Sequence, residues 1–504
     1  MKSFLDHIPT FRRLPGNLWR IVRPLFSRRL WTRLAFGGAC LLTLAMVFHA
    51  VERRRWRGAW KDYEAKAREL GVRLEVNEFP NPEVPDEKNF GEIPYFQDNY
   101  RKPEPPNGVN GPVFDTLLRV LSVSETRAGG LALSELVREA ALKSPIRERI
   151  LTPPGTTEGA ARAILALLDQ ESGGVTRQLR DALARPLCRF PSEWYEGENR
   201  HPKRPPYIRL RNAALLESMR VTLHVAARDD AAALEDLLVS FRLANATKAN
   251  PCLVAAMIRV AITDLTMGGV WLGLNERIWD DATLARIEEK LTEIDLIDAY
   301  QFGMETERAL YNRMFQSFAD DQSELMKAYD SDSKRWRRFA MKYLYPVGWV
   351  YRSQIKTNQY FDLVLADVDR GRGMLKIDIG PAERFIKSAS ELQDFIFLSI
   401  APAPLRAASR TVATEALVRQ ARTACALERY RLKHGEFPSH LDALVSSRFL
   451  TTLPLDPISG APMEYQKFDD DRFSLKSSET SRLTRDVAPW PEAWMPTGRQ
   501  EGRR

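Results

Sequence analysis

An apolar run covers residues 34–51 (LAFGGACLLTLAMVFHAV), with Thr43 and His49 as polar interruptions and no formal charge. A membrane-spanning helix needs about 20 mostly apolar residues, with a range of roughly 17–25. Arg33 stands directly before the run, and the segment 52–55 (ERRR) stands directly after it, which is typical of the two ends of a span. The pattern therefore predicts a transmembrane helix at 34–51.

Two other interpretations of this run fit it less well. A cleaved signal peptide has a shorter basic leader and a small-residue cleavage site, and neither feature is found here. A buried core helix would not carry arginines at both ends.

Charge gives no clear orientation for the span, because residues 18–33 and 52–67 hold similar numbers of Lys and Arg. We expect the leader 1–33 to be cytoplasmic and the body to lie outside.

The next segment, 52–112, is expected to begin with a helix that leaves the membrane over about 56–74. Eight prolines then fall within 79–114, and this density predicts an extended connector, not a helix. Aromatic residues in the connector indicate that it packs along the body. They are Phe79, Phe90, Tyr95, Phe96 and Tyr100.

Helical periodicity returns in the body, 113–405, interrupted by a second connector at about 190–207. Apolar residues at helical spacing mark one helix by Ile208, Leu215, Met219 and Leu223, and a second by Leu234, Leu237, Leu238 and Phe241. The turn 227–230 between them offers a capping carboxylate. Further helices are expected from Pro251, after Asp280 or Asp281, and over about 297–319. No clean 34-residue period is found, so we expect an irregular helical bundle or a tetratricopeptide-like solenoid.

Composition and charge narrow the class of protein. Hydrophobic residues make up 44% and charged residues 28% of the chain, which are ordinary values for a globular protein. The formal net charge is +8, and most of it comes from eight Lys and Arg in residues 1–33 against one acid, Asp6. The remainder is nearly balanced, which disfavours nucleic-acid binding, whereas a basic end beside an apolar run suits lipid headgroups.

Motifs for catalysis are not found. The sequence contains no GxSxG, GxxxxGK[ST] or GxGxxG motif, no HxxxH or HExxH pair, and no CxxC pair among Cys40, Cys188, Cys252 and Cys425. Glu305 and Glu307 are two apart on a predicted helix and point to different faces, so Glu305 is expected to form a surface pair with Arg308. The sequence therefore names no catalytic and no cofactor-binding residue.

One aromatic and basic cluster lies in the second connector. Its members are Phe190, Trp194, Tyr195 and Tyr207, with Arg189, Arg200, Lys203 and Arg204. Such a cluster could dock a partner or a glycan. A packed connector between helical parts is the favoured interpretation.

The C-terminal tail, 406–480, changes character. A helix over about 407–432 is predicted to stop at His434-Gly435, because glycine suits the position after a helix. A short helical turn follows, carrying Leu441 and Leu444. Residues 463–468 and 472–476 then fit two strands that pair across the acidic turn 469–471. The tail is therefore expected to be a small α+β module on a mainly α chain, and 481–504 is expected to be disordered.

This order of a helix, a short helical turn and two paired strands resembles the head region of type II secretion pseudopilins, over about 415–480. The residues that carry the resemblance are Leu427, Tyr430, Gly435, Phe437, Pro438, Leu441, Leu444, Pro454, Asp456, Pro457, Gly460 and Tyr465. The whole chain also resembles a family of uncharacterised bacterial single-pass membrane proteins with a helical middle and this tail. No prepilin-peptidase site precedes Leu34, so assembly into a pilus is not expected.

The resemblance implies an extracytoplasmic tail and raises the question of calcium, because some pseudopilin heads bind calcium near the corresponding sheet. The candidate ligands are Asp456, Asp469, Asp470 and Asp471, although the spacing of an EF-hand is not found. Zinc at His434 and His440 is not expected.

Together these features predict a bacterial inner-membrane protein with a single span. We expect a cell-envelope interaction or scaffold protein that contacts the lipid bilayer and a protein partner, and does not bind nucleic acid. The alternative is an envelope hydrolase whose site is assembled from distant acidic residues.

Overall fold

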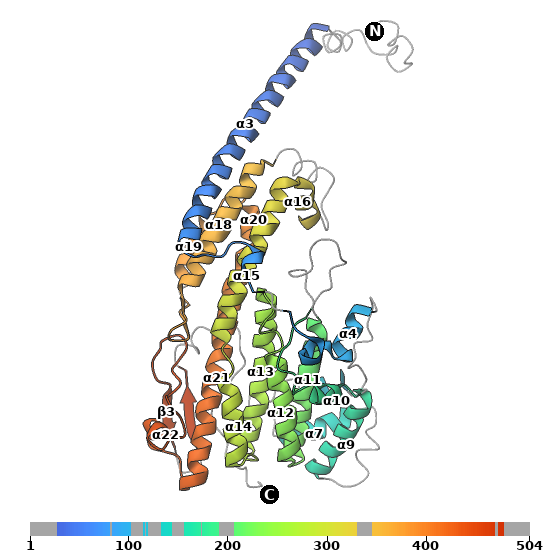
Figure 1. Cartoon of the computed structure of the whole chain (residues 1–504), viewed down its shortest axis with the longest axis vertical. Coiled ribbons are helices and arrows are strands. Elements are labelled where there is room, and N and C mark those ends of the chain that lie inside the picture. The colour runs from blue at the N-terminus through green and yellow to red at the C-terminus, as the bar shows by residue number, and fades with distance from the viewer. Residues whose placement is uncertain are drawn as a thin grey trace, which may run out of the picture. The chain divides into compact units, whose positions relative to one another are not determined.

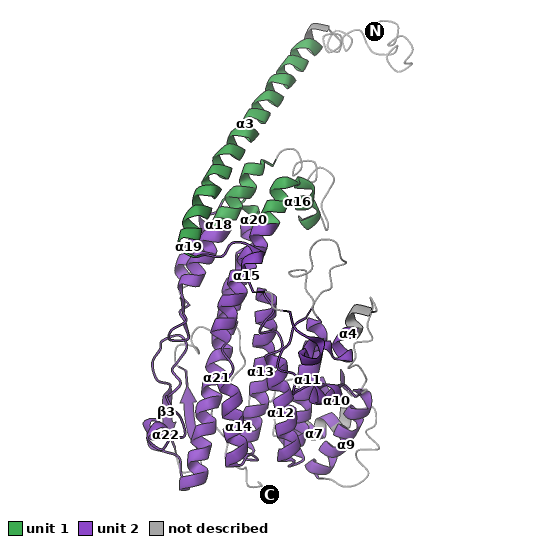
Figure 2. Ribbon diagram, in the orientation of Figure 1, with its two compact units in different colours: residues 1–71, 314–356, 390–396 green, residues 72–313, 357–389, 397–504 purple. Residues whose placement is uncertain are grey.

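The computed structural model describes residues 28–80, 83–101, 114–115, 117–118, 133–143, 156–172, 174–190, 206–329, 345–377, 379–468 and 472–477. This part of the chain is mainly helical, which confirms the predicted fold class at that level (Figure 1). It divides into two compact units, coloured separately in Figure 2. Unit 1 comprises Met1–Gly71, Met314–Lys356 and Ser390–Ile396, and unit 2 comprises Val72–Arg313, Thr357–Ala389 and Phe397–Arg504.

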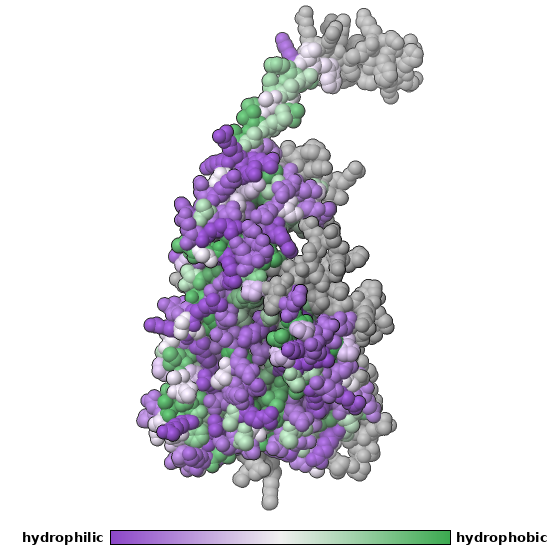
Figure 3. Space-filling view, in the orientation of Figure 1, coloured by the Kyte–Doolittle hydropathy of each residue, from purple (hydrophilic) through white to green (hydrophobic). Residues whose placement is uncertain are grey.

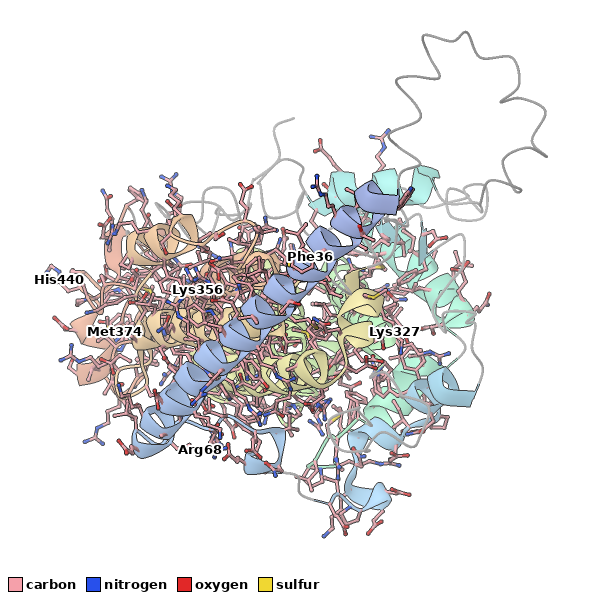
Figure 4. All side chains as sticks on the ribbon, turned by 90° about the horizontal axis from the view of Figure 1, so that it is seen from above. Phe36, Arg68, Lys327, Lys356, Met374 and His440 are labelled. Atoms are coloured by element: carbon pink, nitrogen blue, oxygen red, sulfur yellow. The ribbon has the colours of Figure 1, made fainter. Side chains whose placement is uncertain are left out.

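Unit 1 is built on the helix α3 (Arg28–Glu69), which has 42 residues. The apolar run and the expected post-membrane helix are thus one uninterrupted helix. Phe36, in the apolar run, and Arg68, near the C-terminal end of α3, are labelled in Figure 4. Unit 1 also includes α16 (Gln322–Tyr329) and the first half of α18 (Val347–Ala366).

Two described helices are long and apolar enough to cross a membrane. One is α3, whose most apolar window is 0% buried and forms the largely green rod in Figure 3. The other is α13 (Leu253–Asn275), and 61% of its most apolar window is buried. Because Val260, Met267 and Val270 belong to the core of unit 2, we interpret α13 as a core helix.

Unit 2 contains most of the other helices. They are α4 (Pro94–Arg101), α7 (Leu133–Lys143), α9 (Thr157–Glu171), α10 (Val175–Asp181), α11 (Tyr207–Ala226), α12 (Asp230–Ala244), α14 (Asp281–Thr292), α19 (Ile379–Lys387), α21 (Pro402–His434) and α22 (Asp442–Ser446). Two more helices, α15 (Leu296–Asp320) and α20 (Phe395–Ile400), include residues of both units. Three short 3-10 turns are η3 (Val76–Glu78), η4 (Asp86–Lys88) and η5 (Phe90–Glu92).

The helices α11, α12 and α13 lie side by side (Figure 1). The predicted capping turn is confirmed, because Asp229 Oδ1 accepts a hydrogen bond from Ala232 N at 3.1 Å. The predicted stripe of α11 is wrong at Ile208, which is 71% exposed. The predicted start of α13 at Pro251 is also wrong. The helix begins at Leu253, where the Sγ atom of Cys252 caps it by accepting a hydrogen bond from Ala255 N.

The first connector holds a helix that its proline content seemed to exclude. Pro94 opens α4 at a position where a helix needs no backbone N–H, so proline there is compatible with the helix. The expectation of packing is confirmed, because Phe90, Tyr95 and Phe96 are buried in the core of unit 2.

The C-terminal region follows the predicted order of elements. Gly435 ends α21 with a left-handed φ of 87°, which glycine adopts at little cost. Strands β3 (Glu464–Lys467) and β4 (Phe473–Lys476) pair antiparallel, with Tyr465 opposite Leu475. A second hairpin, β1 (Val368–Asp369) and β2 (Met374–Leu375), was not predicted.

Candidate functional site

A cluster of charged side chains is buried between the helices of unit 2. Glu217, Arg220 and His224 follow one another at spacings of three and four on α11, so they share one face of that helix. Asp236 of α12 belongs to the same cluster. Glu217 and Asp236 are both completely buried, which is rare for carboxylates unless they are paired.

Asp236 is the centre of this network. It forms an ion pair with Arg180 of α10, and its Oδ2 atom lies 3.3 Å from Arg220 Nε and 3.4 Å from His224 Nε2. Arg220 also forms an ion pair with Asp169 of α9. The network therefore links four helices, and the opposite charges beside each buried group offset part of its desolvation cost.

Glu217 lies one helical turn from Arg220, and its main partner is a hydroxyl group and not a cation. Its Oε1 atom accepts a hydrogen bond from Thr176 Oγ1 at 3.0 Å, and its Oε2 atom lies 4.0 Å from Arg220 Nε. Burial, and next the negative charge of Asp236, raise the pKa of Glu217 to about 8. The carboxyl group is therefore mostly protonated at neutral pH.

His224 sits at the outer side of the network. Burial lowers the pKa of His224 against the opposing effect of Asp236, so the imidazole is neutral at neutral pH. Its side chain is 13% exposed, whereas the two carboxylates are fully buried. A protonated acid and a neutral imidazole could in principle exchange protons, but in this conformation the carboxylates are closed to a substrate.

Sequence reasoning missed this network. A signal for it exists, because Glu217, Arg220 and His224 are the ionisable residues of the segment LLESMRVTLHVA and stand at helical spacing. The partner Asp236, however, comes from a different helix, and the spacing on α11 does not identify it.

The calcium candidates were predicted in the tail. Asp456 is buried, and its Oδ1 atom accepts hydrogen bonds from the backbone N–H groups of Ile458 and Ser459 at 2.8 and 2.9 Å. Its Oδ2 atom accepts one from the hydroxyl of Ser477. This carboxylate therefore fixes the turn that follows Pro457. Asp469, Asp470 and Asp471 lie outside the described residues.

A calcium ion needs six to eight oxygen ligands, and three donors already occupy the oxygens of Asp456. Among the described residues, no group of three or more His, Cys, Asp or Glu is placed to hold a metal ion.

The predicted pair of Glu305 and Arg308 is wrong. Glu305 forms an ion pair with Arg73, whereas Arg308 is buried and lies 2.9 Å from Asp362. Glu307 Oε2 accepts a hydrogen bond from Leu253 N at 3.2 Å, at the start of α13. Partners that are distant in the sequence thus replace the predicted local pair. Glu305 and Glu307 contact different parts of the chain, as expected for residues two apart on a helix.

Only the ends of the predicted aromatic cluster are described. Phe190 is fully buried, and the hydroxyl of Tyr207 lies 3.4 Å from Cys252 Sγ. Both residues therefore support the interpretation of a packed connector. The other members, Trp194, Tyr195, Arg200, Lys203 and Arg204, lie outside the described residues.

In unit 1, α3 and α18 meet where the apolar run of α3 ends. Glu52 Oε2 accepts hydrogen bonds from the indole nitrogens of Trp56, at 3.0 Å, and Trp349, at 2.9 Å. A Cβ atom added to Gly348 would lie 2.5 Å from the backbone carbonyl of Glu52, so the two helices are in close contact there. Phe48 packs edge-on against Trp349.

These features define a mainly helical protein whose N-terminal helix is long and apolar enough to cross a membrane. Comparison with protein-family models, curated proteins and solved structures finds no significant match to the chain.

Proposed function

We propose that this protein is a membrane-anchored interaction or scaffold protein of the bacterial cell envelope. It would span the inner membrane once, at 34–51, and carry its body on the extracytoplasmic side. The observation that carries the proposal is the exposure of α3. Its side chains from Leu34 to Phe48 are exposed, including Phe36 at 74%.

Such a surface is unfavourable in water, at roughly 25 cal/mol for each Å² of exposed apolar area. A bilayer core of about 30 Å removes this cost for a helix of this length. Because α3 continues without a break into the contact with α18, the span would be joined to folded protein and not to a flexible linker.

A structural role for the body is supported by the use of its acidic side chains. Asp236 joins three helices, α10, α11 and α12, Asp456 fixes a turn, and Glu415 accepts a hydrogen bond from Leu296 N at 3.1 Å. Each of these carboxylates is buried and serves the packing of the chain. The pseudopilin-like tail would then supply a protein-binding module.

The first test is topology. In a variant with alanine at all four cysteines, a single cysteine is placed at the exposed position His440 (H440C), labelled in Figure 4, or in the leader at Thr10 (T10C). We expect a membrane-impermeant maleimide to label H440C in intact bacteria and T10C only after lysis. The reverse result would place the body in the cytoplasm and overturn the envelope assignment.

Membrane attachment is tested separately. We expect the chain to remain with the membrane pellet after alkaline carbonate extraction. Release into the supernatant would overturn the anchor. A deletion of 34–51 serves as the control, because it should be released.

An envelope hydrolase is the second candidate, and the Glu217, His224 and Asp236 network favours it. Two carboxylates and an imidazole within one cluster, with the pKa of Glu217 raised, are features that active sites share with structural networks. If the protein is a hydrolase, H224Q should abolish turnover of ester, phosphate or glycoside probes while the chain keeps its helical circular dichroism. No turnover by the unaltered protein would reject this candidate for these substrates.

A further inference from the structure

The turn of α3 directly after the apolar run carries four arginines in five residues. Arg53, Arg54, Arg55 and Arg57 are all exposed. Glu52 and Trp56, by contrast, are half-buried and contact α18. Successive residues of an α-helix are about 100° apart, so Arg54 and Arg57 lie on the side of α3 that is turned away from α18, and Arg53 and Arg55 flank the contact with α18. We call these four residues the arginine collar.

The acid nearest to the collar is held by other groups. Glu52 Oε2 accepts hydrogen bonds from both Trp56 and Trp349, and its side chain is only 13% exposed. Its Oε1 atom lies 3.8 Å from Arg55 Nη1, which is a loose pair. Glu52 therefore balances Arg55 in part. Among the residues that the structure describes, Arg53, Arg54 and Arg57 have no acidic partner.

The cations of α18 are neutralised within unit 1. Arg352 binds Asp394 through its Nε and Nη2 atoms, at 2.6 and 3.1 Å, and Lys356 Nζ lies 3.4 Å from the same carboxylate. Burial pushes the pKa of Asp394 upward, but the hydrogen bonds from Arg352 and Ser390 N and the charge of Lys356 outweigh it, so this pKa is lowered. Asp394 is thus an anion under ordinary conditions. The uncompensated charge of this region is concentrated on α3.

We infer that the arginine collar is a binding site for the phosphate headgroups of anionic phospholipids in the leaflet next to the body. The inference rests on the proposed membrane span, because that span places residues 53–57 at headgroup depth. A guanidinium group presents a planar fork of donors that matches phosphate oxygens, and it is more weakly hydrated than an ammonium group. Opposite charge alone would suit any anion, but the collar continues directly from the apolar run, and this position selects a lipid headgroup over a soluble anion.

A lipid-preference measurement tests the site. The full chain is reconstituted in nanodiscs of phosphatidylcholine and phosphatidylglycerol, and the lipids that it retains are counted by native mass spectrometry. Attraction of about fivefold for each arginine near an anionic surface is expected. The triple variant R53Q/R54Q/R57Q should therefore lose at least tenfold in its preference for phosphatidylglycerol.

The matched control is R177Q/R211Q/R286Q. These arginines are also exposed, have no ion pair among the described residues, and change the net charge by the same amount. The control should keep the preference of the unaltered protein. An equal loss of phosphatidylglycerol preference in both variants would show that only net charge matters, and it would overturn the proposed site. An unchanged preference in the collar variant would overturn it too.

The outcome also separates the site from the anchor. If the unaltered chain stays in the membrane pellet after carbonate extraction but shows no preference for phosphatidylglycerol, only the lipid site is wrong. If the chain leaves the pellet, the proposed span is wrong, and the proposed lipid site at the arginine collar is then wrong too.

Discussion

Trp349 Nε1 lies 2.9 Å from Glu52 Oε2, and this hydrogen bond joins two helices that are 297 positions apart in the sequence. Glu52 is the first charged residue after the apolar run of α3. The bond therefore fixes the end of the proposed span to α18. The same carboxylate oxygen also accepts the indole N–H of Trp56, so two tryptophans of unit 1 are held at this point.

Replacing Trp349 with phenylalanine should loosen this contact. W349F keeps most of the ring and loses the donor, at a cost of about 1 kcal/mol. We expect hydrogen exchange of residues 345–356 to become about fivefold faster in detergent or nanodiscs. W271F is the control, because Trp271 Nε1 is buried with no hydrogen-bond partner in the described part of the chain. Equal exchange in W349F and the unaltered protein would contradict the role of the bond.

Gly348 and Gly58 should respond oppositely to alanine. A Cβ atom at Gly348 would lie 2.5 Å from backbone atoms of Glu52, so G348A must push the helices apart. At Gly58, nothing lies within 4 Å, and alanine should stabilise the helix by up to about 1 kcal/mol. We expect the thermal midpoint to fall in G348A and to stay or rise in G58A. A G348A protein as stable as the original would show that the helices do not approach closely there.

The stability of unit 2 should depend on pH through Glu217. With a pKa of about 8 when folded, against about 4.3 when unfolded, Glu217 keeps a proton that the unfolded chain releases between these values. Its contribution is full below about pH 4.3 and is lost as the pH rises to about 8. The loss should amount to a few kcal/mol, at about 1.4 kcal/mol per pKa unit.

Urea unfolding at several pH values measures this effect. E217Q should flatten the decline in unfolding free energy across that window, because glutamine does not titrate. E289Q, which changes an exposed residue of α14, should leave the pH profile as it was. A decline of the same size in E217Q would mean that Glu217 is ionised in the folded protein.

Asp456 should act on stability and not through calcium. D456A removes the acceptor of two backbone N–H groups and of the Ser477 hydroxyl, so we expect a loss of about 2–3 kcal/mol. D442A, at an exposed position of α22, should cost less than about 0.5 kcal/mol. Added calcium should leave the midpoint of the unaltered chain unchanged. A calcium-dependent rise that D456A abolishes would identify Asp456 as a calcium ligand and contradict this prediction.

Local features were predictable from the sequence because a few neighbouring residues determine them. Asp280 caps α14 through Thr283 N, at 2.8 Å, and Gly435 ends α21, as the sequence indicated. The pairing of the two tail strands followed from the acidic turn between them. The start of α13 was misplaced because a cysteine cap at Cys252 is uncommon, and a proline two residues earlier gave the stronger signal.

Relationships between distant helices were not predictable. Arg308 was assigned to the neighbouring Glu305 by spacing, yet it pairs with Asp362, 54 positions away. The same limit hid Asp236 as the partner of His224 and Arg220. Helical periodicity says which residues share a face, but it does not say which other helix covers that face. The apolar run at 34–51 was recognisable because its length and composition alone identify it, without reference to any distant helix.

The helix α21 limits how the C-terminal region, 406–480, can be exchanged or removed. This helix contacts α13 and α14 as well as α22 and β4, and Arg429 Nη1, near its end, lies 3.0 Å from Glu288 Oε2 of α14. A splice near residue 415 would cut inside a helix that the body also needs. The C-terminal region therefore cannot be removed without cutting a core helix of the body. We expect a protein truncated there to have a destabilised body and to be degraded by proteases, even if the tail itself is dispensable.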